Sequence, residues 1–270
     1  MSVSTKFYTL HAMTNAVVRA VSSESSQHPA EHALILEPDF AWQADEADTQ
    51  HYIAIDLTKP FDIDSMVWIH RDTEVVSPSP WGIYADVYYS NIYGTYTKAT
   101  LTVDPGINNL LLKISEFTIT GAQRYWKVVF RSTDDPSYYT PEDTRVSAVW
   151  FAKKYTISAG SIWPMDDTTI YPMKTFNMAY DDKAPVGFNK NEQVFFSRTY
   201  ALNDTDYATM LAMLAATNGG ATLLTMQERD ENPMLVRVSS AVSVQNFAIG
   251  WQTMALTFVQ VPIVGRDDIY

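Results

Sequence analysis

Alternating apolar and polar positions recur along the first half of the chain and predict a series of short β-strands. The runs with period-two, β-branched or aromatic character are residues 51–57, 65–71, 82–90, 97–103, 109–115, 124–132 and 146–157. The segments between them are rich in Pro, Gly, Asn and Asp, which is typical of loops. Seven short strands at this spacing predict a β-sandwich.

An apolar repeat at spacings of three and four marks the second half of the chain. Its members are Tyr207, Met210, Leu211 and Leu214. Such a repeat is typical of one face of an α-helix. Asn203 or Asp204 can cap its start, and the glycine pair after Asn218 can end it, so we predict a helix over about residues 204–217.

Strand patterns lie on both sides of this helix. After it, apolar runs resume at residues 221–228, 233–245 and 250–262. One helix among strands predicts a second β-sandwich or barrel with a single packed helix. The fold class is therefore mainly β, and we place the two domains at residues 1–157 and 158–270.

Composition and charge narrow the class of protein. With 270 residues, 46% hydrophobic and 13% aromatic, the chain is expected to fold throughout. Its formal net charge is -12 without a basic stripe, which disfavours sequence-specific nucleic-acid binding and anionic membranes as partners. The lack of cysteine excludes disulfides and thiol catalysis. No apolar run approaches the roughly 20 residues of a membrane helix, and the first residues do not resemble a signal peptide, so we expect no membrane insertion.

Few residue patterns point to catalysis or to a metal. The run 28–32, His-Pro-Ala-Glu-His, matches the H-x-x-E-H pattern of zinc peptidases, but that site needs both histidines on one helix. Pro29 and the serine-rich segment before it favour a surface turn instead. The acid pairs of the chain are adjacent in sequence, whereas a glycosidase holds two carboxylates across a cleft. A nucleophile elbow and a phosphate-binding glycine loop are missing, so we predict a protein without catalysis or cofactor.

A set of positions around Trp42 is specific for a fold. The matching residues are Ser22-Ser23, Pro29-Ala30, Ala33-Leu34, Asp39, Trp42 and the run 52–57, followed by core strands at 125–129 and 146–150. Together they resemble the discoidin-like, or coagulation factor type-C, galactose-binding-like domain family over roughly residues 15 to 155. This resemblance implies a jelly-roll β-sandwich. It fixes the function less closely, because the same fold serves lectins, phospholipid binders, enzyme accessory modules and structural proteins.

The resemblance also suggests where ligands would bind. Family members often hold calcium through an early Asp and a Glu in the last strand; Asp39 matches the first, but Ala148 stands at the second position. Asp39 is thus a calcium candidate lacking its usual partner. Sugar ligands would stack on loop aromatics at one end of the sandwich. The candidate residues are Trp81, Tyr93, Tyr96, Tyr138 and Tyr139. Alternatively, these side chains close the ends of the sandwich or pack against a neighbouring subunit.

The layout of the second half carries a further resemblance. It has a strand ending in an Arg-x-aromatic segment, an Asp-capped helix, a glycine stop before an apolar strand, a polar turn before residues 233–238, and a closing strand ending near Pro262. Residues 156–265 are similar in this layout to ring-forming proteins of long-tailed bacteriophages, especially distal tail and tail-tube-type proteins. The resemblance implies a ring, which we expect to be a hexamer, whose exposed strand edges are paired by neighbouring copies. The acidic charge suits a DNA channel, and equally a soluble protein.

Two function hypotheses follow. The main prediction is a structural component of a bacteriophage tail tip or baseplate: a distal tail-like ring protein of the virion, assembled in the host cytoplasm. Its N-terminal half would contact other tail or baseplate proteins or a host-surface glycan. The alternative is a carbohydrate-binding module or lectin with an accessory β-domain. A ring protein must assemble with closed symmetry, whereas a lectin must bind sugar saturably through its aromatic residues.

Overall fold

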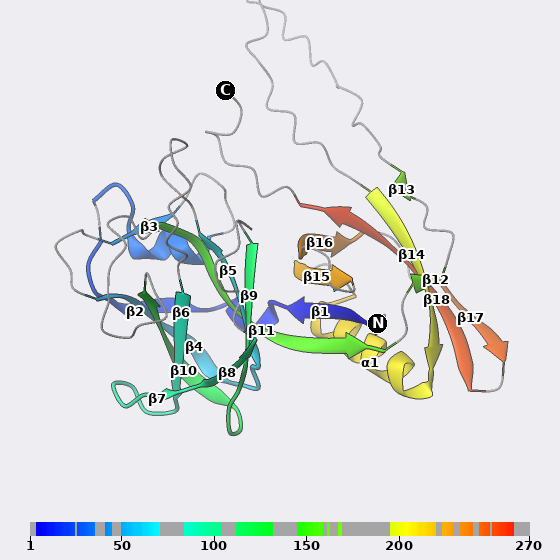
Figure 1. Ribbon diagram of the computed structural model, residues 1–270, viewed down its shortest axis with the longest axis horizontal. Coiled ribbons are helices and arrows are strands. Elements are labelled where there is room, and N and C mark those ends of the chain that lie inside the picture. Colours follow the sequence, from blue (N-terminus) through cyan, green and yellow to red (C-terminus); the bar gives the residue numbers. More distant parts are fainter. Residues whose placement is uncertain are drawn as a thin grey trace, which may run out of the picture.

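Both halves of the computed structural model are built mainly from β-strands (Figure 1). The structure describes residues 4–24, 26–35, 41–44, 50–70, 84–103, 112–131, 145–158, 161–162, 167–168, 195–219, 223–228, 233–239, 243–248 and 250–261. Within these ranges there is one α-helix, packed in the second half. The predicted fold class, mainly β with a jelly-roll sandwich first and a helix-bearing β unit second, is confirmed.

The N-terminal half is a sandwich of two antiparallel sheets. The first sheet has the order β2 (Val17–Val21), β4 (His51–Phe61), β10 (Gln123–Arg131), β6 (Tyr84–Ser90), β7 (Thr97–Lys98). The second has the order β8 (Thr100–Val103), β9 (Leu112–Thr118), β5 (Ser65–His70), β11 (Arg145–Ile157), and β3 (Trp42–Gln43) also pairs with β11. Apolar side chains that alternate along these strands meet between the sheets, as period-two burial requires.

Large aromatic rings fill the core of the sandwich. Trp42, Trp68 and Trp126 are fully buried there together with Phe130 and Phe151. The rings of Trp126 and Phe151, which come from opposite sheets, have centroids 4.6 Å apart. Each such ring removes a large apolar area from water, so this cluster dominates the stability of the sandwich.

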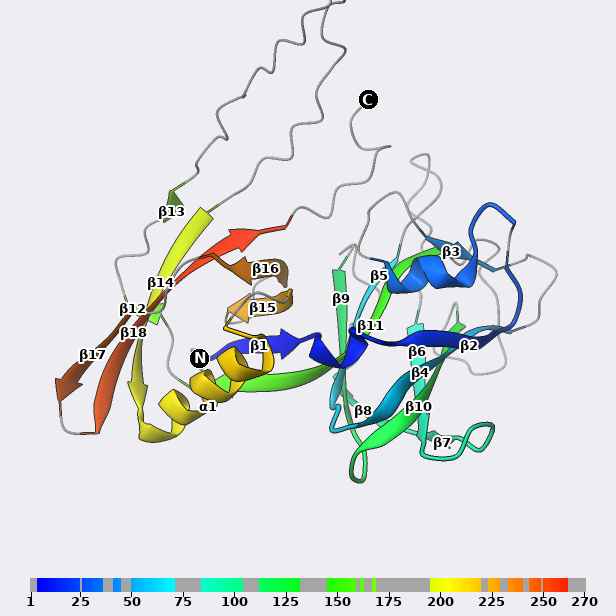
Figure 2. The same ribbon diagram turned by 180° about the vertical axis from the view of Figure 1, so that it is seen from behind.

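The long strand β11 continues from the sandwich into the second half. Its first part pairs with β5, and its last part, Lys153 to Ile157, pairs with β1 (Thr5–Thr9). On its other edge β1 pairs with β15 (Leu224–Glu228). The two halves are therefore joined by backbone hydrogen bonds as well as by the chain itself (Figure 2).

The second half is a curved sheet that wraps a core of its own. After β1 and β15 the strand order is β16 (Met234–Val238), β18 (Trp251–Gln260), β14 (Phe195–Asn203) and β12 (Ser161–Ile162); β13 (Asp167–Thr168) pairs with β14, and β17 (Ser243–Ala248) with β18. Although β18 and β16 separate β14 from β15 in the sheet, the Nε of Arg198 on β14 lies 3.0 Å from Glu228 Oε2 on β15. This contact requires strong curvature, and Phe7 and Phe258 pack inside it.

The helix α1 (Asp204–Ala216) begins and ends close to the predicted residues. Asn203 is the cap: its Oδ1 accepts a hydrogen bond from the Asp206 N–H at 2.8 Å. The prediction that Leu211 belongs to the packed face of the helix is wrong, because its side chain is 43% exposed. The buried face runs through Met210 and Met213, and Leu211 lies beside that face and points toward solvent.

Several boundaries differ from the sequence prediction. The strands β1 and β2 lie in the first 21 residues, where we expected none. The predicted strand 97–103 is divided into β7 and β8, and the run 233–245 is divided between β16 and β17. Where a surface turn was predicted, the last three residues of the His-Pro-Ala-Glu-His run begin a short 3-10 helix (Ala30–Leu34). Its first N–H donates to the Glu24 carboxylate at 2.8 Å. Its alanines are buried, so this segment closes the sandwich core.

Candidate functional site

Two of the five predicted ligand-binding aromatics fall within the described residues. Tyr93 and Tyr96 lie in the connection between β6 and β7, and the Tyr93 side chain is 51% exposed. The other candidates lie outside the described residues: Trp81, Tyr138, Tyr139 and the calcium candidate Asp39.

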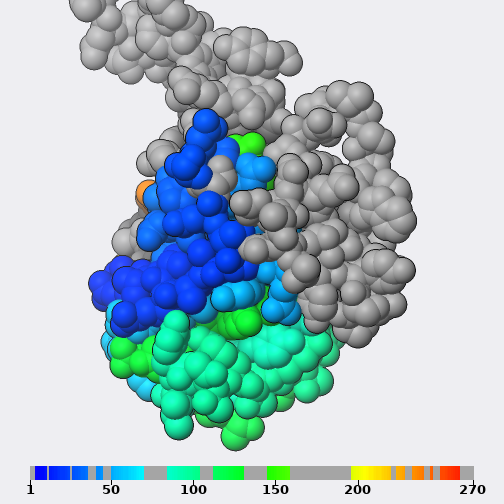
Figure 3. Space-filling model, turned by 90° about the vertical axis from the view of Figure 1, so that its left-hand side faces the viewer, coloured from blue at the N-terminus to red at the C-terminus, as the bar shows by residue number. Residues whose placement is uncertain are grey.

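Tyr93 and Tyr96 belong to a larger group of tyrosines on the outer side of the five-stranded sheet. Tyr52 on β4, Tyr88 on β6 and Tyr125 on β10 point outward, because the next residue in each strand packs into the core or faces it. We call this group the tyrosine face; its members are Tyr52, Tyr88, Tyr93, Tyr96 and Tyr125. Figure 3 shows the side of the molecule on which β2, β4, β10 and β6 follow one another across the surface.

Two rings of the tyrosine face are in direct contact. The centroids of Tyr93 and Tyr125 lie 5.6 Å apart with an interplanar angle of 63°, an edge-to-face arrangement. Burial, together with the nearby Tyr93 and Tyr125 phenols and the Asp56 carboxylate, raises the pKa of Tyr96 to about 12. Tyr96 therefore stays a neutral hydrogen-bonding phenol at physiological pH.

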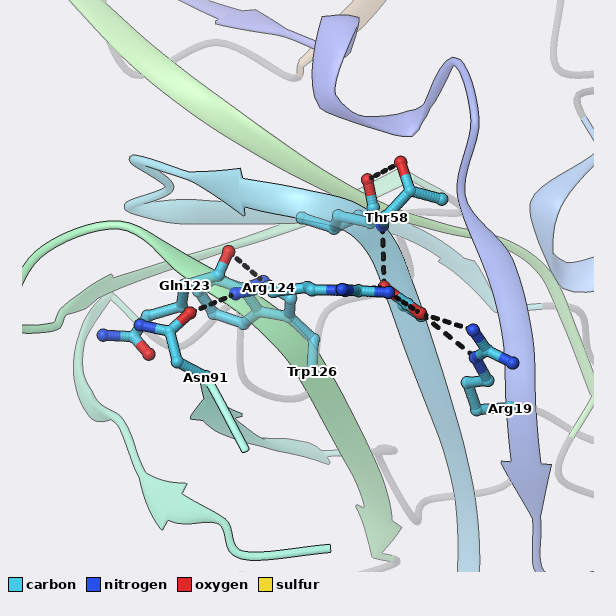
Figure 4. Close-up of polar contacts among 8 residues, drawn as sticks. Arg19, Thr58, Asn91, Gln123, Arg124 and Trp126 are labelled. Carbon is cyan, nitrogen blue, oxygen red and sulfur yellow. Dashed lines mark hydrogen bonds and ion pairs between the residues drawn. The ribbon is translucent and has the colours of Figure 1, made fainter. Parts of the chain in front are cut away.

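The loop that carries Tyr93 and Tyr96 is held against the start of β10 (Figure 4). The Asn91 side chain donates through Nδ2 to the Ala122 carbonyl at 2.9 Å and accepts at Oδ1 from the Arg124 N–H at 3.1 Å. The turn passes through Gly94 at φ +88°, which a side chain would disfavour. These bonds fix the loop tyrosines beside the strand tyrosines.

A buried carboxylate lies beneath the same face. Asp56 on β4 is fully buried and accepts two hydrogen bonds from Arg124, Nε to Oδ1 at 2.8 Å and Nη2 to Oδ2 at 3.0 Å. Arg19 on β2 donates to Oδ2 through Nη2 at 2.8 Å and Nε at 3.1 Å. The Thr58 N–H adds a bond to Oδ1 at 2.7 Å, so all lone pairs are engaged (Figure 4).

The hydrogen bonds make Asp56 a strong acid. The hydrogen bonds from Arg124 have the largest influence on the pKa of Asp56 and lower it, whereas burial raises it. The bonds from Arg19 and Thr58 lower the pKa further, to about 2. Arg124 also lies over Tyr125, with its guanidinium carbon 4.8 Å from the ring centroid. Asp56 thus fixes two guanidinium groups next to the tyrosines.

Cations outnumber carboxylates on the described part of this face. The cations are Arg19, Lys98, Arg124 and Lys127. The carboxylates are Asp56 and Asp86, the latter paired with Lys98 at 2.8 Å. Four cations against two carboxylates leave a net charge of +2, in a chain whose formal net charge is -12.

Other buried ion pairs hold the fold together. Glu116 on β9 accepts from Lys6 at 2.9 Å, Tyr8 at 2.8 Å and Lys154 at 2.7 Å, where the two halves meet. Burial alone would raise the pKa of Glu116, but the bonds from Lys154 and Lys6 outweigh it and lower the pKa. In the second half, Glu228 pairs with Arg198 inside the curved sheet. Both acids are therefore engaged by structural partners.

The described residues hold neither a cluster of metal ligands nor a membrane-spanning helix. Within these ranges, acidic, histidine and cysteine side chains do not gather in threes that could hold a metal ion. None of the helical segments that the structure describes is long and apolar enough to span a bilayer.

Solved structures of carbohydrate-binding modules are among those that resemble part of this chain. No family model matches the chain, and no curated protein matches it. The family 32 carbohydrate-binding module of NanJ from Clostridium perfringens, solved with galactose, is 14% identical with a TM-score of 0.40, over 55% of this chain and 99% of that one. CBM32-3 from a family 31 glycoside hydrolase of the same organism is 14% identical, with a TM-score of 0.42, over 52% and 92%. The C-terminal domain of a Bacteroides fragilis chitobiase is 13% identical, with a TM-score of 0.42, over 54% and 97%.

The sequence prediction missed the strand residues of this face. It assigned the aromatic candidates to loops, and it used Asp56 only as part of a fold motif. The signal was present, because a carboxylate within an apolar strand such as Ile53 to Leu57 must find cationic partners when it is buried. Alternation along β10 likewise places Tyr125 and Lys127 on the same outward side.

Proposed function

We propose that this protein binds saccharides, without catalysis, and that the tyrosine face receives the sugar rings. One observation carries the proposal: five tyrosines, from three strands and one fixed loop, gather on the outer side of one sheet. Outward positions of a sheet are usually polar and solvated. Aromatic rings exposed there supply the flat apolar surface on which a sugar ring packs.

Polar groups around the rings supply orientation. The Tyr96 phenol stays neutral, and the guanidinium groups of Arg19 and Arg124 have N–H donors beyond those that bind Asp56. Because the Asn91 and Asp56 hydrogen bonds already hold the loop and the arginines, little ordering is left to be done on binding. Tyrosine rings that are already ordered and are surrounded by hydrogen-bond donors suit a hydroxyl-rich ligand better than an apolar one.

Calorimetric titration against a panel of soluble oligosaccharides tests this proposal. Tyr93→Ala and Tyr125→Ala should each weaken binding about tenfold, since loss of a packed ring costs on the order of 1–2 kcal/mol. Trp251→Ala is the matched control, because this side chain is also exposed, at 44%, but lies at the far end of the second half. Failure of every saccharide to bind the wild-type chain, or equal losses in all three variants, would reject the tyrosine face.

A ring subunit of a bacteriophage tail is the second candidate function. A specific observation favours it: among the described strands, β17 pairs only with β18, so its other backbone edge is unpaired. Val244 on β17 and Trp251 on β18 are both more than 40% exposed. An unpaired edge with exposed apolar side chains is a surface that a second copy could extend.

Solution mass separates this candidate from a saccharide-binding monomer. Light scattering over a concentration series, followed by electron microscopy, should show a closed ring for a tail subunit, and Val244→Lys should dissociate it. A monomer of 30.5 kDa at every concentration would count against ring formation by the chain alone. Ring assembly and sugar binding use different surfaces, so each result stands by itself.

A further inference from the structure

Within the part of the chain that the structure describes, Lys127 occupies the centre of the tyrosine face without an acidic partner. It lies on β10, directly opposite Ala54 on β4 and Tyr88 on β6. Its Nζ sits 4.0 Å from the centroid of the Tyr52 ring. Among the described residues no carboxylate lies within ion-pair distance of it, whereas Arg19, Arg124 and Lys98 on the same face all have one.

The surroundings of Lys127 disfavour the charged form of its side chain. The side chain is half-buried, and burial lowers the pKa of its ammonium group. The Tyr52 ring offsets part of this cost through a cation-π contact. An anion placed on the ammonium group would supply the ion pair that the described residues do not provide.

The neighbouring ion pairs present cations rather than carboxylates to solvent. Asp56 and Asp86 are almost fully covered, with 0% and 6% of their side chains exposed. Their partners reach the surface: 49% of the Arg19 side chain and 50% of the Lys98 side chain are exposed. A ligand approaching this face therefore meets N–H donors first, and the overall acidity of the chain is screened beyond about 8 Å at physiological salt.

We propose that the tyrosine face binds an acidic saccharide, with Lys127 contacting the anionic substituent while the tyrosine rings pack against the sugar. This inference rests on the proposed saccharide-binding function and specifies its ligand class. The ligand is a sugar carrying a carboxylate or a sulfate, and its ring must reach Tyr125 while its charge reaches Lys127. These two residues are separated by one position on β10 and point to the same side, so one monosaccharide unit spans them.

The experiment compares sugars that differ in charge alone. Wild-type protein is titrated by calorimetry with tetragalacturonate, with its fully methyl-esterified counterpart, with a sulfated heparin tetrasaccharide and with an oligothymidylate. The acidic sugar should bind about tenfold more tightly than the ester, the scale of one charge-assisted hydrogen bond. Lys127→Met, which keeps the apolar stem, should lower acidic binding to the level of the ester and leave the ester unchanged.

Lys59→Met is the matched control, because Lys59 also lies over an aromatic ring, 5.1 Å from the Phe61 centroid, but beyond Asp56 at the end of β4. It should bind the acidic sugar as the wild type does. Binding of the sulfated sugar alone, with the same dependence on Lys127, supports the proposal and identifies sulfate as the anion.

Four outcomes would overturn the proposal. Equal, measurable affinity for acid and ester, or a preference for the acid that survives Lys127→Met, rejects the acidic ligand but leaves saccharide binding intact. Absence of binding to any sugar rejects both. Tighter binding of the oligothymidylate, lost in Lys127→Met and Tyr125→Ala, would assign the face to single-stranded nucleic acid, whose bases also stack on aromatic rings.

Discussion

Replacement of Asp56 by Asn tests the ion-pair cluster beneath the tyrosine face. The folded state lowers the pKa of Asp56 from its ordinary value of 3.8 to about 2. A shift of this size stabilises the fold by roughly 2 kcal/mol at pH 7. Asp56→Asn also leaves Arg19 and Arg124 without a counter-charge, but both reach solvent, so we expect a total loss of about 2–3 kcal/mol.

The sign of the pH dependence follows from the lowered pKa. The stabilisation from Asp56 is fully present above pH 3.8 and is lost as the pH falls through about 2. Urea unfolding followed by tryptophan fluorescence would therefore show a large difference between wild type and Asp56→Asn at pH 7. That difference should shrink by roughly 1 kcal/mol at pH 3, because about half of the ionisation contribution is then gone.

A matched control is Asp62→Asn, since Asp62 also accepts from a lysine, Lys153 at 2.8 Å, but has a side chain that is 69% exposed. Exposed pairs contribute little, so this variant should change unfolding by less than about 0.5 kcal/mol. A difference between wild type and Asp56→Asn that stays constant from pH 7 to pH 3 would refute the reasoning. The same holds if Asp62→Asn proved equally damaging.

Three further changes test the second half, each read by urea or thermal unfolding. Glu228→Leu should lower the free energy of unfolding by about 3–5 kcal/mol because it leaves the buried Arg198 without its counter-charge. Adding Arg198→Met should recover most of this loss. A double variant that stays as unstable as Glu228→Leu would show that the two residues do not act as an isolated ion pair. Asn203→Ala removes the acceptor of the Asp206 N–H and should cost about 1 kcal/mol, whereas no change would mean that the cap is replaced by water. Gly219→Ala should cost about 1 kcal/mol from φ +71° alone, since its Cβ would meet no atom within 4 Å; a neutral result would show that the helix end relaxes.

Local patterns in the sequence predicted the fold where neighbouring residues decide the structure. The strand β4 was predicted, and the helix cap was narrowed to Asn203 or Asp204, because alternation and capping act over a few residues; the structure selects Asn203. The strand β1 was missed because five residues carry a weak pattern, and its partners β11 and β15 lie about 150 and 220 residues further along the chain. Leu211 was misplaced because a repeat at three and four fits two adjacent helix faces, and only the packed sheet selects one.

The candidate site was predictable only in part for the same reason. Tyr93 and Tyr96 stood out because a loop exposes its aromatics. Which strands would lie beside that loop depends on the register of β10 against β4 and β6, and this register brings Tyr125 next to Tyr93. That Lys127 has no carboxylate partner among the described residues could not be predicted from the sequence, because its neighbours across the sheet, Ala54 and Tyr88, come from strands far away in the chain.

Asp56 links the stability of the sandwich to the chemistry of its outer face. Its two bonds to Arg124 hold that guanidinium 4.8 Å from the Tyr125 ring centroid, so the arginine is ordered before a ligand arrives. In Asp56→Asn the acceptor is neutral and holds Arg124 less firmly, so the Arg124 side chain samples more rotamers. Ordering this side chain again when a ligand binds would reduce the binding free energy. Below its unfolding transition, the folded Asp56→Asn variant should thus bind an acidic saccharide several-fold more weakly, while Asp62→Asn binds normally. Unchanged affinity in Asp56→Asn would confine this carboxylate to a stabilising role and leave Lys127 and the tyrosines as the ligand contacts.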